Sequence, residues 1–186
     1  MGVEKTEGKA EWRKKCRVLR QAVSAEREAA LCRVLASFLQ ELPDGTLLGI
    51  YWPMRHEPDI RSVATAWQKE RGGSLAIPAV EQGVMAYRLW HPDGPMTTDA
   101  CGMNVPAGPE VLPDVLLVPC LGFSPEGHRL GYGGGYFDRY LAAYRSVRRV
   151  LLAYDEQCVP SALFEAHDLR FDGRLSDCGC TFFEQV

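Results

Sequence analysis

The chain is organised around residues 129–139, which read Arg129-Leu130-Gly131-Tyr132-Gly133-Gly134-Gly135-Tyr136-Phe137-Asp138-Arg139. An apolar run, Val115-Leu116-Leu117-Val118-Pro119, precedes this stretch, and tyrosine and leucine residues at helical spacing follow it over residues 136–144. This order predicts a buried strand, a glycine loop and then a helix.

The four glycines of the loop favour an anion-binding site. Glycine has no Cβ, so the backbone can approach a ligand closely and can adopt positive φ. The start of the following helix offers unpaired N–H groups and a partial positive charge, which suit phosphate. The loop is not a Walker A motif, because no Lys-Ser or Lys-Thr follows the last glycine. The spacing of a Rossmann dinucleotide loop also fails, and glycine content alone is equally typical of a surface turn.

The residues that flank the glycines favour a binding loop over a surface turn. Arg129 can pair with phosphate oxygens. Tyr132 and Tyr136 can pack their rings against a heterocycle. Asp138, in the first turn of the predicted helix, can hold Mg²⁺ together with phosphate oxygens.

The rest of the chain alternates between predicted helices and strands. Helices are expected over residues 9–22, with Trp12, Cys16, Leu19 and Val23 on the apolar face, and from the cap Ser24 to residue 42. A third helix is expected to begin with Pro58 at its first position. Strands are expected over 46–52, 74–77 (ending at Pro78), 84–90, 114–119 and 148–154. Residues 91–113 and the tail 155–186 are expected to be irregular, with a short helical stretch at 161–166.

This alternation predicts a single α/β domain over residues 1–186, with residues 1–8 disordered. The expected fold is an open, largely parallel sheet with helices on both faces, a Rossmann-like three-layer arrangement. Ligands of such sheets bind beyond the carboxyl ends of the strands. The glycine loop follows a predicted strand, and so do residues 53–57, 78–82 and 155–157.

Composition excludes few functions but sets expectations about partners. The 186 residues are 46% hydrophobic and 24% charged, with a net charge of −3, so we expect neither nucleic acid nor an anionic membrane as partner. No apolar stretch is long enough to span a bilayer, and residues 1–11 do not resemble a secretory signal. Seven cysteines without a framework spacing predict free thiols in a reducing cytoplasm. The close pair Cys178 and Cys180 lacks the further ligands of a zinc site.

Residues 122–139 resemble the signature of the 5-formyltetrahydrofolate cyclo-ligase family, whose members are also called methenyltetrahydrofolate synthetases. The resemblance extends along the chain. Lys9-x-x-Trp12-Arg13 is similar to the family's N-terminal Lys-x-x-Leu-Arg, and residues 22–26 match the stretch that follows it. Glu57 resembles the folate-contacting glutamate, and His167-Asp168 resembles an acidic pair near the C-terminus.

The resemblance implies ATP- and Mg²⁺-dependent ring closure of 5-formyltetrahydrofolate to 5,10-methenyltetrahydrofolate, catalysed by a cytoplasmic monomer. It implies catalytic roles for Lys9, Arg129 and Tyr136, and Mg²⁺ binding by Asp138 and Asp168. The residues implied for ATP are Lys9, Arg13, Arg129, Leu130, Gly131, Tyr132, Gly133, Gly134, Gly135, Tyr136 and Phe137. Those implied for the reduced folate are Trp52, Glu57, Tyr132, Gly133, Gly134, Gly135 and Tyr136. Lys9 and Arg13, at i and i+4, share one helix face and can both point at a triphosphate.

Other interpretations of the same residues stay open. Glu57 is also placed to cap the following helix, Trp52 to be a core aromatic, and Asp168 to cap a loop. Met103 stands where some relatives have tryptophan, and Ser176 where the family often has threonine. A sugar-phosphate isomerase-like enzyme and a non-catalytic nucleotide-binding regulator are the competing functions. The Lys9–Arg13 pair favours a polyphosphate ligand over the first of them.

Overall fold

The computed structural model describes residues 7–183. The predicted disorder of residues 1–8 falls largely outside this range, because residues 1–6 are not described. Within the described part, Glu7 accepts a hydrogen bond from Lys15 and Gly8 precedes the first helix.

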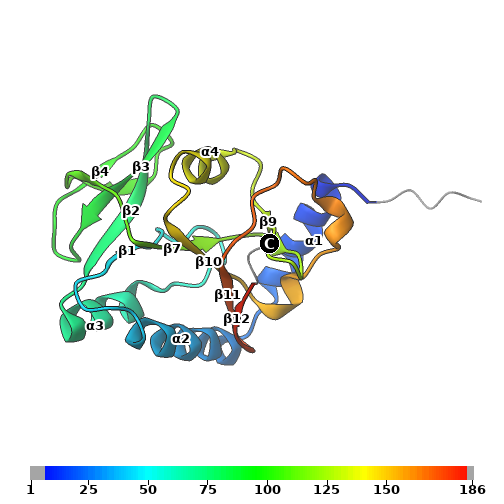
Figure 1. The fold of residues 1–186 in the computed structure, drawn as a ribbon, viewed down its shortest axis with the longest axis horizontal. Coiled ribbons are helices and arrows are strands. Elements are labelled where there is room, and N and C mark those ends of the chain that lie inside the picture. Colours follow the sequence, from blue (N-terminus) through cyan, green and yellow to red (C-terminus); the bar gives the residue numbers. More distant parts are fainter. Residues whose placement is uncertain (1–6, 184–186) are drawn as a thin grey trace, which may run out of the picture.

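A mostly parallel sheet runs through the molecule (Figure 1). In residues 7–183 it has eight strands in the order β12-β11-β10-β7-β1-β2-β3-β6. The strands are β1 (Leu47–Gly49), β2 (Ser74–Glu81), β3 (Val84–Trp90), β6 (Glu110–Val111), β7 (Val115–Pro119), β10 (Arg148–Leu152), β11 (Gly173–Ser176) and β12 (Gly179–Phe182). The central five, β11-β10-β7-β1-β2, are parallel, and antiparallel partners flank them on both sides.

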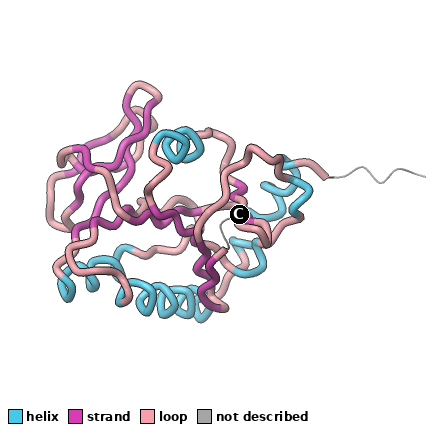
Figure 2. The backbone as a smooth tube through the Cα atoms, in the orientation of Figure 1, coloured by secondary structure: helices cyan, strands magenta, loops and turns pink. Residues whose placement is uncertain are grey.

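Helices cover both faces of this sheet, which confirms the predicted three-layer fold. Helices α2 (Ala25–Gln40) and α3 (Arg61–Arg71) lie on one face and α4 (Tyr136–Ala143) on the other (Figure 1). Figure 2 shows the strands as a band with helical segments above and below it. Helix α1 (Lys9–Gln21) lies beside the short hairpin of β8 (Gly122–Phe123) and β9 (Arg129–Leu130), away from the β2–β3 hairpin (Figure 1).

Alternation along the strands produces two cores. In β7, Val115 and Leu117 face the core under α2 and α3, whereas Leu116 and Val118 face the core under α4. This is the period-2 pattern of a strand buried on both faces, which reads in sequence as a continuous apolar run.

The apolar face predicted for the first helix is partly wrong. Cys16 is fully buried as expected, in a small third core with Leu130. The second buried residue of this helix is Arg20, whereas Leu19 is 36% exposed. The helix is therefore rotated so that the i and i+4 pair Cys16 and Arg20 faces inward, because Arg20 has buried polar partners that are distant in sequence.

The predicted start of the third helix is also wrong. Helix α3 begins at Arg61, with Ile60 as its N-cap, rather than at Pro58. The Pro58 carbonyl instead accepts a hydrogen bond of 2.9 Å from the buried Tyr51 hydroxyl. Asp59 accepts the Arg61 N–H at 3.1 Å, so the helix start is organised by Asp59. Glu57 consequently does not cap this helix.

Three regions hold more strand than predicted. Strand β2 continues through Pro78 to Glu81, with Pro78 paired opposite Tyr87 of β3. Residues 91–113 contain the hairpin of β4 (Met96–Thr98) and β5 (Asn104–Pro106), together with β6. The tail contributes two 3₁₀ turns, η1 (Asp155–Gln157) and η2 (Ser161–Leu163), and then strands β11 and β12.

Candidate functional site

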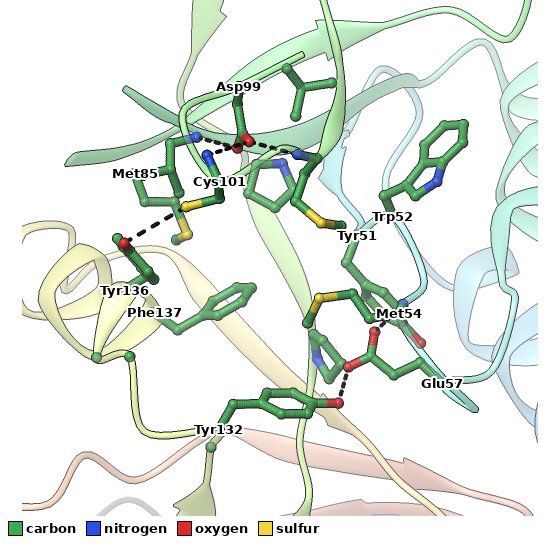
Figure 3. A pocket seen from close by; sticks show the side chains of 18 of the residues that line it. Tyr51, Trp52, Met54, Glu57, Met85, Asp99, Cys101, Tyr132, Tyr136 and Phe137 are labelled. Carbon is green, nitrogen blue, oxygen red and sulfur yellow. Dashed lines mark hydrogen bonds between the residues drawn. The ribbon is translucent and has the colours of Figure 1, made fainter. Parts of the chain in front are cut away.

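A cavity of about 350 Å³ opens beyond the carboxyl ends of the central strands, within the size range of small-molecule sites. The β1–α3 connection, the end of β7, the 99–105 loop and the glycine loop all contribute to it (Figure 3). Its lining residues are Tyr51, Trp52, Met54, Glu57, Pro78, Val80, Met85, Asp99, Cys101, Met103, Asn104, Val105, Pro119, Arg129, Gly131, Tyr132, Gly133, Gly134, Gly135, Tyr136, Phe137 and Asp138.

The glycine loop has the backbone geometry that only glycine adopts without strain. Gly133 has φ of +103° and Gly135, the N-cap of α4, has φ of +68°. A Cβ at Gly131 would lie 2.6 Å from an Arg129 Nη atom, and one at Gly135 would lie 2.8 Å from an Arg139 Nη atom. The absence of side chains thus lets guanidinium groups approach the loop backbone.

Three arginines surround this loop from different elements. Arg13 of α1 donates its Nε–H to the Gly131 carbonyl at 2.8 Å, and its guanidinium lies beside Gly133. Arg129 comes from β9 and Arg139 from α4. This concentration of fixed positive charge beside the loop's backbone amides is suited to a polyanion.

The Arg129 side chain is buried and held in place. Its Nε–H donates to the Pro119 carbonyl at the end of β7, at 3.0 Å. Its guanidinium carbon lies 4.9 Å from the centre of the Phe137 ring, and one Nη lies 3.5 Å from Asp138 Oδ1. The Asp138 carboxylate remains 62% exposed, so it can take a further ligand.

Lys9 and Asp168 form an ion pair with each other. The Lys9 Nζ lies 2.8 Å from Asp168 Oδ2, and the same oxygen accepts the Glu165 N–H at 2.8 Å. Burial disfavours the Asp168 carboxylate, but its contacts with Lys9 and the Glu165 amide outweigh burial and lower the pKa of Asp168. Neither side chain lines the cavity.

On the β1–α3 connection, the Glu57 carboxylate is at the centre of a buried polar cluster. One oxygen accepts a short hydrogen bond from the Tyr132 hydroxyl, and the other accepts the Met54 N–H at 2.8 Å (Figure 3). Arg20 donates to the Tyr132 oxygen at 2.5 Å and lies 3.7 Å from Glu57. Burial raises the pKa of the Glu57 carboxyl, and its hydrogen bonds and the Arg20 and Arg129 cations partly offset that rise.

A third wall comes from the 99–103 loop, in which the sequence singled out Met103 but neither Asp99 nor Cys101. The Asp99 carboxylate accepts three backbone hydrogen bonds of 2.9 Å, from Val80, Cys101 and Met103 (Figure 3). These bonds fix the loop over the cavity and place Cys101 Sγ 3.7 Å from the Tyr136 hydroxyl. An aspartate two residues before the loop cysteine is the local signal of such a turn.

Trp52 lines the cavity and also packs against the main core, so it is a core aromatic, while its predicted contact with folate stays a prediction. Its ring makes an edge contact with Trp90 at 6.4 Å, and the Arg61 guanidinium lies 4.2 Å above it.

The structure brings most of the predicted site residues together. Those that line the cavity are Trp52, Glu57, Arg129, Gly131, Tyr132, Gly133, Gly134, Gly135, Tyr136, Phe137 and Asp138. Arg13 reaches the glycine loop from behind, Leu130 is buried in the small core, and the Lys9–Asp168 pair stands apart from the cavity lining. Arg20 and Arg139 were not predicted; only the i+4 spacing of Arg20 from buried Cys16 hinted at its orientation.

Fold and site together define a class: mostly parallel α/β proteins with a cationic glycine loop and a heterocycle-sized cavity at the carboxyl ends of the strands. Comparison with known proteins narrows this class. A sequence model of the 5-formyltetrahydrofolate cyclo-ligase family matches residues 5–175. The chain belongs to that family.

Individual relatives agree with this assignment. A 5-formyltetrahydrofolate cyclo-ligase of Mus musculus is 38% identical over 64 residues, 32% of each chain. One of Haemophilus influenzae is 34% identical over 105 residues, 52% of this chain and 55% of the relative. These matches therefore span between about a third and a little over half of each relative's length.

A solved structure extends the similarity to the whole fold. The 5,10-methenyltetrahydrofolate synthetase of Aquifex aeolicus superimposes with a TM-score of 0.78 at 28% identity, over 96% of this chain and 94% of that one. A synthetase of Mycoplasma pneumoniae has the same fold, with a TM-score of 0.73 at 22% identity over 92% and 99%.

The donor set within residues 7–183 limits how a metal ion could be held. It contains no group of three or more His, Cys, Asp or Glu side chains suited to a metal ion. Mg²⁺ bound to phosphates needs only one or two protein carboxylates. Asp138, exposed at the cavity, meets that need, and the glycine cradle fits a polyphosphate. The described part of the chain also holds no helix with the length and apolarity to cross a bilayer.

Proposed function

We propose that this protein converts 5-formyltetrahydrofolate to 5,10-methenyltetrahydrofolate with ATP as the phosphoryl donor and Mg²⁺ as its counter-ion. The observation that carries the proposal is the cavity itself, which joins two unlike ligand sites. The glycine loop and Arg129 form one part of its lining, and the buried Glu57 carboxylate, bonded to Tyr132 of that loop, forms the adjoining part. Membership of the cyclo-ligase family supports the same reaction.

The chemical difficulty is that the N5-formyl group is an amide and a poor electrophile. In the proposed reaction the formyl oxygen attacks the γ-phosphorus of ATP and displaces ADP. N10 then attacks the formyl carbon and loses its proton, and the C–O bond breaks as phosphate leaves. Little covalent chemistry falls to the protein, whose task is positioning and neutralisation of charge.

The residues divide this task by their position. Arg129 and Arg13, with the amides of the glycine loop, neutralise and orient the phosphates. Lys9 adds a further positive charge at the phosphates when its ion pair with Asp168 opens. Asp138 holds Mg²⁺, with Asp168 as the second predicted carboxylate. The Mg²⁺ supplies compensation of the phosphate charge.

In the proposal, the folate is held at the wall formed by the β1–α3 connection. A carboxylate such as Glu57 accepts two N–H donors, which matches the amino-pyrimidine edge of a pterin. Trp52 provides an apolar wall. Tyr132 and Tyr136 lie between the two sites, so the formyl oxygen and the γ-phosphate would meet beside the glycine loop.

A direct assay tests the reaction. Purified protein is mixed with Mg-ATP and 5-formyltetrahydrofolate, and the near-ultraviolet absorbance of the methenyl product is followed. We expect a steady rise that stops when ATP is omitted. Binding of both ligands without any rise would instead favour a non-catalytic regulator, and a rise without ATP would refute the phosphoryl-transfer mechanism.

A further inference from the structure

Arg20 is a buried arginine that no part of the reaction above uses. Its side chain is 4% exposed, and that of its neighbour Glu57 is 1% exposed. Its guanidinium donates two hydrogen bonds, one to the Tyr132 hydroxyl at 2.5 Å and one to the Arg55 carbonyl at 2.7 Å. Arginines are almost never buried unless they are paired, so the question is what this pairing achieves.

The contacts run in one direction, from cation to carboxylate. Arg20 donates to the Tyr132 oxygen, and the Tyr132 hydroxyl then donates to Glu57 Oε1. The second Glu57 oxygen is fixed by the Met54 amide. A carboxylate held at both oxygens has one orientation, and Glu57 lines the cavity in that orientation (Figure 3).

We propose that Arg20 is a positioning residue for the substrate: through the Tyr132 hydroxyl, it fixes both the orientation and the negative charge of the Glu57 carboxylate that receives the pterin edge. This proposal rests on the proposed function, in which Glu57 binds the folate. It adds a residue from α1, 37 positions before Glu57 in the sequence, whose side chain does not line the cavity.

The charge of Glu57 matters because only the ionised carboxylate accepts two N–H donors. The titratable and charged groups around it are Arg20, Arg129, Tyr132, Tyr51 and Cys120. Burial raises the pKa of both tyrosines well above their usual value and that of Cys120 to about 12, so these three groups stay neutral near neutral pH. Among these groups, the two arginines are those whose charge lowers the pKa of Glu57, and Arg20 lies 3.7 Å from its carboxylate.

Removal of Arg20 should therefore weaken folate binding in a pH-dependent way. In Arg20→Met, burial acts on Glu57 with less opposition, so the pKa of Glu57 rises further. Binding of 5-formyltetrahydrofolate should fall by at least about tenfold at neutral pH, the equivalent of one charged hydrogen bond. It should recover as the pH is raised, and the pH at which binding is half-lost should lie above that of the wild type.

The experiment measures the dissociation constants of 5-formyltetrahydrofolate and of Mg-ATP by calorimetry over a pH series. Arg17→Met, an exposed arginine on the same helix, is the matched control and should behave as the wild type. Arg20→Lys, which keeps the charge, should restore part of the folate affinity. Mg-ATP affinity should fall less than folate affinity in Arg20→Met, because Arg20 bonds the Tyr132 hydroxyl that points to Glu57 and not the loop amides that cradle the phosphates.

Each outcome decides the proposal. Wild-type folate affinity and pH profile in Arg20→Met would overturn it, and so would an equal loss of both ligands, which indicates a purely structural role. If Arg20→Met does not fold, the double variant Arg20→Met/Glu57→Gln is measured instead, because it removes both buried charges. The proposal requires that this double variant bind folate as Glu57→Gln does; weaker binding would overturn it. A wild-type protein that binds no 5-formyltetrahydrofolate would instead overturn the proposed function first.

Discussion

Lys9 of α1 and Asp168, 159 positions later, form an ion pair at 2.8 Å that ties the start of the first helix to the loop after η2. Lys9 is predicted to bind ATP and Asp168 to bind Mg²⁺. In the structure the two side chains bind each other instead. Their side chains are 34% and 27% exposed, so the pair is weak enough to exchange when a triphosphate and its metal ion arrive.

Loss of Lys9 or of Arg129, the two cations with predicted catalytic roles, should greatly reduce turnover. We expect Lys9→Ala and Arg129→Ala to slow methenyl formation by at least about a hundredfold. Each variant lacks a cation that would neutralise the negative charge of the transferred phosphoryl group. For Lys9→Ala the free energy of unfolding should change by no more than about 1 kcal/mol, since its ion pair is partly exposed. Lys14→Ala, an exposed lysine on the same helix, is the control. Normal turnover by both variants would refute the assignment of roles.

The glycine loop should not tolerate a side chain at Gly133. Its φ of +103° is a strained conformation for alanine, so Gly133→Ala should cost roughly 1–2 kcal/mol of stability. The same substitution should weaken ATP binding, because the Cβ would enter the cradle beside Arg13. Gly83→Ala in the β2–β3 turn has a similar φ of +80° and open space around it. This control should lose stability but keep its ATP affinity. Equal ATP affinity in both variants would remove the glycine loop from the nucleotide site.

The parts of the fold that sequence reasoning predicted are those with a strong local pattern. Strand β3 coincides with the predicted residues 84–90, and β7 with the buried apolar run that ends at Pro119. The glycine loop and α4 follow in the expected order because glycines and helical spacing are both local signals. Strands β11 and β12 were missed because both are short. Strand β12 is an exposed edge strand that pairs with β11 across a tight turn, and β11 is placed by its parallel pairing with β10, which is more distant in the sequence.

The candidate site divides in the same way. Arg129, Tyr136 and Asp138 were predicted because they flank the glycines in sequence. Arg20 could not be recognised, because its partner Tyr132 is 112 positions away and its spacing from Cys16 alone does not mark an arginine as buried. The misplaced start of α3 has a similar cause. Pro58 favours a helix start by propensity, but its carbonyl accepts a hydrogen bond from the Tyr51 hydroxyl, and the helix begins only at Arg61.

Metal dependence should separate the two predicted carboxylate ligands from general effects on stability. We expect Asp138→Asn to raise the Mg²⁺ concentration needed for half-maximal turnover by about tenfold or more, because an amide is a poorer ligand than a carboxylate. Asp168→Asn should produce a similar shift if Lys9 gives way to the metal ion. Turnover is measured over a Mg²⁺ series at constant ATP, with the exposed Asp93→Asn as control. An unchanged Mg²⁺ requirement in Asp168→Asn would leave Asp168 as the partner of Lys9 alone.

His128 should make stability depend on pH in the weakly acidic range. Its ring stacks on Phe164 at 5.1 Å, and its Nδ1 lies 3.0 Å from the Ser124 hydroxyl. Burial, with a further contribution from Arg170, lowers its pKa below the ordinary value of 6.5. The unfolded chain therefore binds a proton at His128 at a higher pH than the folded protein does. His128 contributes a stability that is present above pH 6.5 and is lost as the pH falls toward the folded pKa.

The difference between variants isolates this contribution from the other titrating groups. Urea denaturation is followed over a pH series from neutral to weakly acidic for the wild type, His128→Gln and the exposed control His91→Gln. The free energy of unfolding of the wild type and of His91→Gln should fall more steeply with decreasing pH than that of His128→Gln. Parallel profiles for all three proteins would show that His128 has the same proton affinity in the folded and unfolded states. The burial of its ring against Phe164 would then have no part in acid sensitivity.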